Sequence, residues 1–410
     1  MSDVAPVQEQ SRIKSLDVIR GFALLGILAV NALLFAGPWQ TMQNALLPPL
    51  DITEQTLWSW LVMHVFFEFK CITLFSMLFG VSIYLVGGDG SDRARGSLLR
   101  RRLFWLLVFG LLHGLLIWYG DILLMYALTG FVVMLVRSWR ALTLMIAGVL
   151  LLLLSIGLQG MLGAFWDYIP PEQLGPLQQE LEAVFTPSGE EIARVQAAYQ
   201  GGLLSALQEN VDSWVMLVTS SFVGLIIRTA AVMMIGMALF KWGFLSGKAP
   251  VWLYALSIAV AGAALYVIWR QAMVNWDARF DTVHMLTGGI MTNVALSIFV
   301  SLGYASALIL LVKAGAGLIT GPLAAVGRMA FTNYIAQSLI MTTIFWSGRG
   351  FGLFGEIDRV ALWGIIVAVW VLQLIWSPLW LAKFQMGSLE WLWRRLSYGK
   401  PIAIGKAAPA

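Results

Sequence analysis

A histidine in the middle of an apolar stretch is the residue of this chain whose position most suggests chemistry. His113 lies ten residues beyond Leu103, where the stretch begins, so a helix would place it about 15 Å along, near the middle of a membrane. An imidazole there could act as a general base or carry an acyl group. Asp121 and Tyr126 follow on the turn and second arm of the same hairpin, but Asp121 is eight residues on, so contact would require a bend. The alternative is an interhelical hydrogen bond that serves packing alone.

A second histidine belongs to a longer apolar stretch that carries charges. His64 and Glu68 are four residues apart and share a helix face, the spacing of a base and the acid that orients it. The stretch from Leu57 to Val86 would extend about 45 Å as one helix, too long for a core of about 30 Å. We therefore expect an interfacial or re-entrant helix that leads into a span. On that expectation the pair is solvated, and Lys70, which points away from Glu68 by helical phase, anchors the helix at the interface.

An acid and an arginine stand at the mouth of the first apolar stretch. Asp17 and Arg20 are three residues apart, so they share a helix face and can pair. The arginine could receive an anionic ligand that the acid orients, or the pair could only fix the helix in register. Asn31, deeper in the stretch, needs a hydrogen-bond partner, either a ligand or another helix. Arg228 and Arg328 lie in or beside later spans, where either could neutralise a buried acid.

The elements that must position these residues are membrane helices. Of 410 residues, 59% are hydrophobic and 12% are charged, about half the charged fraction of a soluble domain. Apolar runs of roughly 18 residues or more recur and predict transmembrane helices. The predicted fold class is all-α, a polytopic transmembrane helical bundle of about ten spans with a small external helical cap. We divide it into an N-terminal bundle (1–162), an external loop or cap (163–212), a C-terminal bundle (213–386) and a cytoplasmic amphipathic tail (387–410).

The distribution of charge predicts the orientation. Lysines and arginines gather in alternate loops and near both ends, whereas residues 165–212 hold eight acids and one arginine. The positive-inside rule then places both termini in the cytoplasm. The net charge of +4 is explained by this topology and calls for no nucleic-acid partner. The single cysteine, Cys71, excludes an intramolecular disulfide, and we expect no metal.

Motifs of soluble enzymes are absent from the sequence. It contains no Gly-rich phosphate loop, no nucleophile elbow and no metal-ligand cluster. A mechanism borrowed from soluble enzymes therefore finds no support.

Several short motifs together resemble one family. They are Arg12 to Ala23 (RIKSLDVIRGFA), Thr73 to Gly80 (TLFSMLFG), Leu112-His113-Gly114 with Gly120 to Leu123 and Tyr126-Ala127, Val326 to Ala330 (VGRMA), Thr332-Asn333-Tyr334, and Gly387 to Arg394 (GSLEWLWR) with Tyr398-Gly399. Their combination is similar to the YeiB-like bacterial membrane proteins, including the domain of unknown function in their C-terminal half. The resemblance implies a location in the inner membrane of a bacterium.

The resemblance implies a place within a broader group of transmembrane acyltransferases, with the acyltransferase-three and heparan-glucosaminide acetyltransferase-like proteins. These pass an acyl group from cytoplasmic acyl-CoA to an acceptor, often a sugar, across the membrane. Acyltransferase-three proteins usually carry a histidine about eleven residues after the arginine that matches Arg20. Here that position is Asn31, so their catalytic histidine cannot be carried over, and His113 or His64 would have to replace it.

The leading hypothesis is a membrane acyltransferase with no permanently bound cofactor and with acyl-CoA as donor. Arg20 and Asp17 would hold the CoA end, His113 would deprotonate the acceptor, and Asp121 or Glu68 would orient that histidine or bind a saccharide or lipid-linked acceptor. The residues expected in catalysis are His113, Asp121 and Glu68, and those expected to bind ligand are Asp17, Arg20, Asn31, His64, Lys70, Tyr126 and Arg328. A transporter or permease for a small solute or lipid-linked species is the first alternative, a non-catalytic membrane scaffold is the second, and a homodimer is left open.

Overall fold

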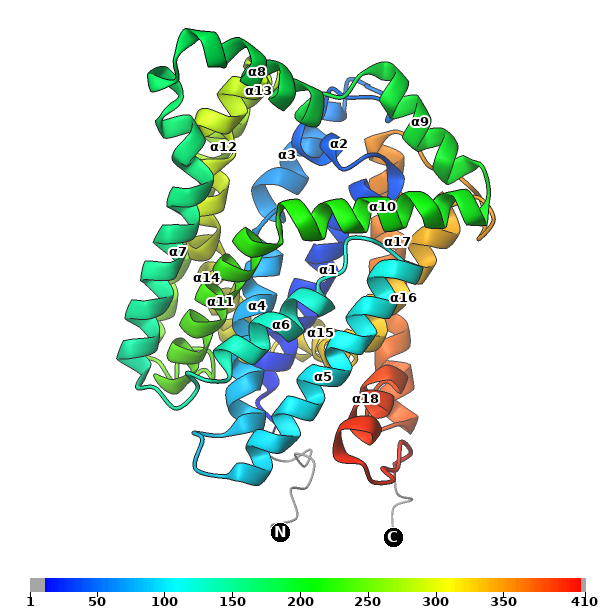
Figure 1. Ribbon diagram of the computed structural model, residues 1–410. Coiled ribbons are helices and arrows are strands. Elements are labelled where there is room, and N and C mark those ends of the chain that lie inside the picture. The colour runs from blue at the N-terminus through cyan, green and yellow to red at the C-terminus, as the bar shows by residue number, and fades with distance from the viewer. Residues whose placement is uncertain (1–11, 407–410) are drawn as a thin grey trace.

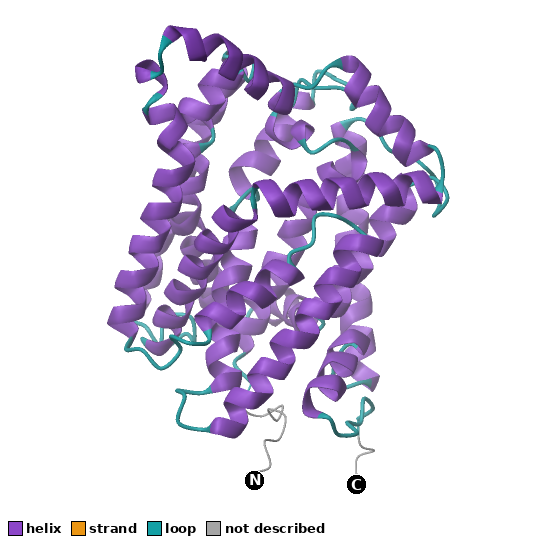
Figure 2. Ribbon diagram, viewed as in Figure 1, coloured by secondary structure: helices purple, strands orange, loops and turns teal. Residues whose placement is uncertain are grey.

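The computed structural model describes residues 12–406, and this part of the chain is helical and contains no β-strand (Figure 2). The helices of the first half are α1 (Lys14–Ala36), α2 (Gln40–Gln43), α3 (Thr56–Phe66), α4 (Lys70–Gly87), α5 (Arg93–Leu116), α6 (Leu123–Val133), α7 (Ala141–Ala164), the 3₁₀ turn η2 (Trp166–Tyr168), α8 (Pro171–Phe185), α9 (Gly189–Gln200) and α10 (Leu203–Ser220). Those of the second half are α11 (Phe222–Lys241), α12 (Val251–Asp277), α13 (Thr282–His284), the π-helix η3 (Met285–Gly289), α14 (Met291–Lys313), α15 (Gly317–Arg328), α16 (Ala330–Phe345), α17 (Arg359–Lys383) and α18 (Ser388–Tyr398).

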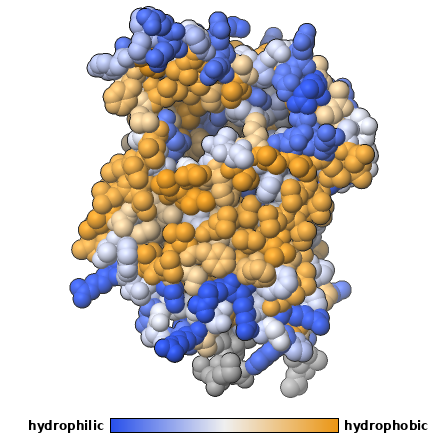
Figure 3. All heavy atoms as spheres, viewed as in Figure 1, coloured by the Kyte–Doolittle hydropathy of each residue, from blue (hydrophilic) through white to orange (hydrophobic). Residues whose placement is uncertain are grey.

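The expected all-α polytopic bundle is confirmed. Within the described residues, seven segments are long and apolar enough to cross a membrane: α1, α3 with α4, α7, α11, α12, α14 and α17. The space-filling view shows a broad apolar belt with polar residues above and below it (Figure 3). Helices α5, α6 and α16 join the bundle but are more charged or shorter than these seven. The protein is therefore a multi-pass membrane protein.

The two ends of the bundle differ. The start of α1, the loop before α5 and α18 lie at the lower end in Figure 1, whereas α8 and α9 form a cap at the upper end. Helix α10 runs across the bundle beneath α9 instead of along it. The cap and α10 fall in the segment where the sequence is rich in acids.

Helix α1 is the centre of the bundle, because it packs against α4, α14, α15, α16 and α17. Its closest approach is to α15. A Cβ at Gly21 would lie 2.0 Å from the Leu323 carbonyl oxygen, and one at Gly327 would lie 1.9 Å from the Asp17 carbonyl oxygen. Only glycine permits this backbone contact. The contact brings the start of α1 and the end of α15 together at the lower end.

The long second apolar stretch is broken, as its length predicted. Helix α3 ends at Phe66 and α4 begins at Lys70, and Phe69 between them has a left-handed backbone with φ 62°. Helix α3 does not lie free at an interface, however, because Trp60 and Met63 are buried in the main core. The charged residues at the break are therefore inside the protein.

Candidate functional site

A cavity of about 310 Å³ opens at the lower end of the bundle, between α1, α4, α5, α6, α15, α16 and α18. Its wall combines a cluster of cations with aromatic rings. The charged lining residues are Arg12, Asp17, Arg20, Arg102, Arg328, Glu390 and Arg394, and the aromatic ones are Phe75, Phe79, Tyr126, Phe331, Tyr334 and Trp393. Five arginines against two acids give the cavity an excess of positive charge, which favours an anionic ligand.

The predicted pair at the start of α1 is confirmed. Arg20 Nη1 donates to Asp17 Oδ1 at 2.9 Å, and Arg12 Nε lies 3.9 Å from Asp17 Oδ2. Burial lowers the pKa of Arg12 and of Arg394, and the charge of Arg328 acts in the same direction on both. The cations therefore repel one another in a partly dehydrated wall, and an anion would relieve that repulsion.

Glu390 connects the arginine cluster to α16. Its carboxylate accepts from the backbone N–H groups of Phe331 (2.7 Å) and Thr332 (3.2 Å) and from the Thr332 hydroxyl (2.5 Å). An acid is favourable at a helix N-terminus. Burial raises the pKa of Glu390, although these hydrogen bonds oppose the shift. Glu390 thereby fixes the start of α16, the helix that leads from the cavity towards the centre of the bundle.

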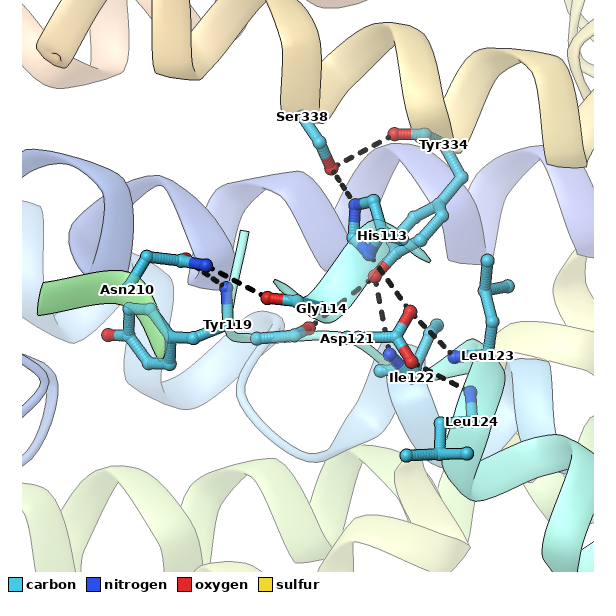
Figure 4. Close-up of polar contacts among 11 residues, drawn as sticks. His113, Gly114, Tyr119, Asp121, Ile122, Leu123, Leu124, Asn210, Tyr334 and Ser338 are labelled. Carbon is cyan, nitrogen blue, oxygen red and sulfur yellow. Dashed lines mark hydrogen bonds and ion pairs between the residues drawn. The ribbon is translucent and has the colours of Figure 1, made fainter. Parts of the chain in front are cut away.

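His113 lies beyond the inner end of this cavity, in a chain of hydrogen bonds (Figure 4). Its Nδ1 is 2.9 Å from Asp121 Oδ1, and its Nε2 is 2.9 Å from the hydroxyl oxygen of Ser338 on α16. The side chains of His113 and Asp121 are each only 1% exposed. An ionised carboxylate only accepts hydrogen bonds, so it selects the imidazole form with the proton on Nδ1 and leaves the Nε2 lone pair facing Ser338.

The contact between Asp121 and His113 arises from the bend that the sequence alone did not specify. Helix α5 ends at Leu116, and the turn folds back until Asp121 accepts from the backbone N–H groups of Leu123 and Leu124 at the start of α6. Helices α5 and α6 can approach this closely because residue 110 is a glycine. A Cβ at Gly110 would lie only 2.3 Å from the backbone nitrogen of Leu124. Asp121 thus caps a helix and orients the histidine. Glu68, the other acid considered for that role, pairs with His64 instead.

Sequence reasoning missed Ser338. It lies 225 residues from His113, and one serine in an apolar helix has no distinguishing pattern. The available signal was the number of polar side chains along the otherwise apolar α16, of which Asn333 and Gln337 bond to α17. The buried ones are Asn333, Tyr334, Gln337, Ser338 and Thr342.

Tyr334 separates His113 from the arginine-lined cavity. Its ring lines the cavity, and its centroid is 5.1 Å from that of His113. Ile122 and Tyr126 line the cavity beside it, and the Tyr126 hydroxyl is 2.9 Å from the Ser76 hydroxyl. The cavity therefore reaches to within one side chain of the histidine. The expectation that Tyr126 and Arg328 face a ligand space with Asp17 and Arg20 is consistent with this lining.

A second cavity, of about 180 Å³, lies on the other side of His113, towards the cap. It is lined by aromatic, acidic and amide side chains and by one arginine that pairs with two of the acids. The lining includes Trp39, Gln40, Tyr119, Glu191, Arg194, Tyr199, Glu209 and Asp212. Two rings lie between this cavity and the histidine. Tyr119 lines the cavity, its centroid is 5.7 Å from that of Trp118, and the Trp118 centroid is 6.4 Å from that of His113. Asn210 of α10 holds the intervening turn by accepting from Tyr119 N at 2.6 Å and donating to Gly114 O at 2.9 Å (Figure 4). His113 thus lies between cavities at opposite ends.

The charged residues at the α3–α4 break form a separate cluster. The expectation of a solvated pair is wrong, because His64 and Glu68 are each 5% exposed and Lys70 is not exposed at all. His64 Nδ1 lies 2.5 Å from Glu68 Oε2, and Lys70 Nζ donates to His64 O at 2.7 Å and to the side chain of Asn293. Lys70 turns inwards because the break resets the helical phase. His64, Glu68 and Lys70 line neither cavity.

Two further expectations are corrected. Asn31 is only half-buried, lines neither cavity and makes no side-chain hydrogen bond within residues 12–406, so a ligand-binding role has no support. Arg228 donates to the hydroxyls of Thr73 and Ser297, at 2.8 and 3.0 Å, and is paired with no carboxylate in the described part of the chain. It is stabilised by hydroxyl dipoles instead of an acid.

Comparison with known proteins places the chain in a family. Residues 239–400 match the family model described as "Protein of unknown function (DUF418)". The chain is 30% identical to "Uncharacterized protein YeiB" of Escherichia coli over 93% of its own length and 95% of that protein. It is also 30% identical to "Uncharacterized protein YxaH" of Bacillus subtilis, over 98% and 99% of the two chains. No solved structure matches it. Similarity over nearly the whole length shows that the chain belongs to the YeiB-like family.

Proposed function

We propose that the protein is a membrane acyltransferase, which moves an acyl group from an acyl-CoA to a hydroxyl or amine acceptor on the opposite side of the membrane. One observation carries this proposal. An imidazole with a carboxylate at one nitrogen and a hydroxyl at the other lies between two cavities, and the cavity at one end is lined by arginines.

The arginine-lined cavity suits the donor. Coenzyme A carries several phosphates on its nucleotide end and a thin pantetheine arm that ends in the thioester. Arg20, Arg328 and Arg394 would hold the phosphates at the mouth. The arm would extend between the phenylalanine rings of the wall towards Tyr334. Because acyl-CoA is made in the cytoplasm, this end faces the cytoplasm, as the positive-inside rule also requires for the arginine-rich loop before α5.

The histidine supplies the base. With Asp121 accepting from Nδ1, Nε2 is free to take a proton from an attacking hydroxyl or amine, and Asp121 stabilises the imidazolium that forms. General base catalysis of this kind contributes about 10²–10⁴-fold to a rate. Burial keeps water, the competing nucleophile, away from the reacting carbonyl.

The second cavity suits the acceptor. Trp39 and Tyr119 offer aromatic faces and Asp212 offers oxygen acceptors, whereas Glu209 is paired with Arg194. A sugar ring or a lipid-linked saccharide has the apolar faces and the hydroxyl groups that such a wall contacts. On the proposed topology this cavity lies outside the cytoplasm of a bacterial inner membrane.

The test uses the purified full-length protein in lipid nanodiscs. We expect it to bind acetyl-, butyryl- or palmitoyl-CoA, and to release free CoA when monosaccharide or amino-sugar acceptors are added. His113→Ala should abolish this release, and Arg20→Ala should raise the concentration of acyl-CoA required. Arg140→Ala is the matched control, because Arg140 is exposed at the same end and outside the cavity. Absence of both acyl-CoA binding and CoA release would contradict the proposal.

The buried cluster of His64, Glu68, Lys70 and Asn293 favours a transporter as the second candidate. Ionisable groups inside a membrane often line a pathway for ions or solutes, and this cluster is not used by the proposed chemistry. Solute uptake into proteoliposomes without any acyl donor, lost on Glu68→Gln, would support that function instead.

A further inference from the structure

We propose that Ser338 is the nucleophile of the reaction and carries the acyl group as an ester between the two cavities. The inference rests on the proposed acyltransferase function and adds a residue and a covalent intermediate to it. Ser338, His113 and Asp121 come from α16, α5 and the turn after α5, and they are hydrogen-bonded in series with two contacts of 2.9 Å (Figure 4). The order of acid, base and hydroxyl is that of an activated serine.

The arrangement exceeds what helix packing requires. A serine inside a helix satisfies its hydroxyl with the carbonyl one turn back, as Ser76 and Ser82 do here at 2.8 and 2.9 Å. Ser338 has that option too, but the Tyr334 carbonyl is 3.3 Å away and the imidazole nitrogen is closer, at 2.9 Å. Burying an acid, an imidazole and a hydroxyl is costly unless they are hydrogen-bonded, and here the hydrogen bonds join all three in one series.

The position of Ser338 between the two cavities explains why a covalent intermediate would be useful. Donor and acceptor reach the histidine from opposite sides, past Tyr334 and past Trp118. A direct transfer would need both barriers to open at once, which would open the membrane to leakage. An acyl group held on Ser338 lets one side close before the other opens. Tyr334 is one turn before Ser338 on α16 and lines the donor cavity, so displacing its ring would expose the hydroxyl.

Trp118 supplies an unsatisfied donor. Its indole N–H is buried and has no hydrogen-bond partner within residues 12–406, although buried donors are rarely left unpaired. The ring packs edge-on to His113. We assign this N–H to the carbonyl oxygen of the acyl group, which becomes an oxyanion during attack.

The chemistry balances in two steps. First, the Ser338 oxygen attacks the thioester carbonyl while His113 Nε2 takes the hydroxyl proton. The carbon–sulfur bond then breaks, and the CoA thiolate leaves with that proton as free CoA. Second, the acceptor hydroxyl or amine attacks the seryl ester as His113 takes its proton. The carbon–oxygen bond to Ser338 breaks, the acylated acceptor leaves, and the proton returns to the serine.

The test is to trap the intermediate on the full-length protein in nanodiscs. Radiolabelled acetyl-, butyryl- and palmitoyl-CoA are supplied without acceptor, and the denatured protein is examined by intact mass and peptide mapping. We expect label on the peptide that holds Ser338, stable to neutral hydroxylamine and released by alkaline hydroxylamine. Ser338→Ala should lose it. Ser338→Cys should give a thioester that neutral hydroxylamine releases. Ser306→Ala is the control, because Ser306 is fully buried in α14 and its hydroxyl has no partner in the described chain.

A serine-directed fluorophosphonate gives a readout that does not depend on the acyl chain. Labelling should require Ser338 and His113 and should persist in Ser306→Ala. The decisive comparison is the rate of CoA release in the presence of an acceptor. If Ser338→Ala remains folded by size-exclusion chromatography and its rate is within about threefold of the wild-type rate, the nucleophile assignment is wrong and the acyltransferase proposal stands. If the wild type neither releases CoA nor reacts with acyl donor or fluorophosphonate, both fall.

Discussion

His113 has a hydrogen-bond partner at each ring nitrogen, and its chemistry depends on which partner carries charge. Asp121 Oδ1 faces Nδ1, while both oxygens of the same carboxylate also accept backbone N–H groups of α6. These donors fix the orientation of the carboxylate. An amide in its place has one acceptor oxygen, so it would keep one of the two backbone hydrogen bonds but would not stabilise an imidazolium. Most of the charge effect can therefore be separated from the cap by mutation.

Asp121→Asn is expected to lower the rate of CoA release by about 10²–10⁴-fold, because the imidazole loses both its tautomer preference and its counter-charge. The melting temperature in detergent should fall only modestly, because the amide oxygen keeps one of the two backbone hydrogen bonds of the cap. Steady-state kinetics with a thermal-shift assay in parallel separate the two effects. A loss of rate matched by a loss of folded protein would show that Asp121 serves the fold alone.

Lys70→Met tests the second polar cluster. The Lys70 ammonium donates to His64 O and to the Asn293 side chain, so the substitution leaves two buried acceptors without that donor. A buried polar group left unpaired typically costs about 1–3 kcal/mol, so we expect a clearly lower melting temperature. CoA release per folded molecule should stay near wild type, because the cluster lines neither cavity; a selective loss of activity would connect the cluster to function.

At the scale of helices, what could be predicted depended on sequence distance. The Asp17–Arg20 pair followed from a spacing of three within one helix, and so did the apolar spans. Asp121 was named as a partner of His113, although the bend that brings the two together was not specified, whereas Lys70 was misplaced because the helix break resets the direction of its side chain. Ser338 and Asn293 could not be predicted, because their partners lie more than 200 residues away and depend on which helices pack together.

The packing of α1 on α15 yields a prediction with an internal control. Gly327→Ala would place a methyl group against the backbone of α1, with the Asp17 carbonyl oxygen 1.9 Å away. The helices must separate, so we expect a lower melting temperature and weaker acyl-CoA binding, because Asp17 and Arg328 both line the donor cavity. Gly321→Ala lies on the same helix with open space around it, and it should stabilise by up to about 1 kcal/mol. Equal behaviour of the two variants would contradict the contact.

The whole molecule has two chemically different ends, with arginines around one cavity and acids around the other. Such asymmetry makes function depend on orientation, because a donor that exists only in the cytoplasm can reach only one of the two cavities. The orientation can be measured by labelling introduced cysteines, because the single native cysteine, Cys71, is fully buried. Exposed serines at each end can be replaced without touching either cavity.

Ser91→Cys, in the loop before α5, and Ser188→Cys, between α8 and α9, report the two ends. In intact bacterial cells, a membrane-impermeant maleimide should label Ser188→Cys, and it should label Ser91→Cys only after the membrane is permeabilised. Both side chains are exposed, so a difference reflects sidedness and not burial, and the unsubstituted protein should remain unlabelled. The reverse pattern would place the arginine-lined cavity outside the cell. A CoA donor could not then reach it, whereas a solute pathway would be unaffected, so one labelling experiment weighs the acyltransferase against the transporter.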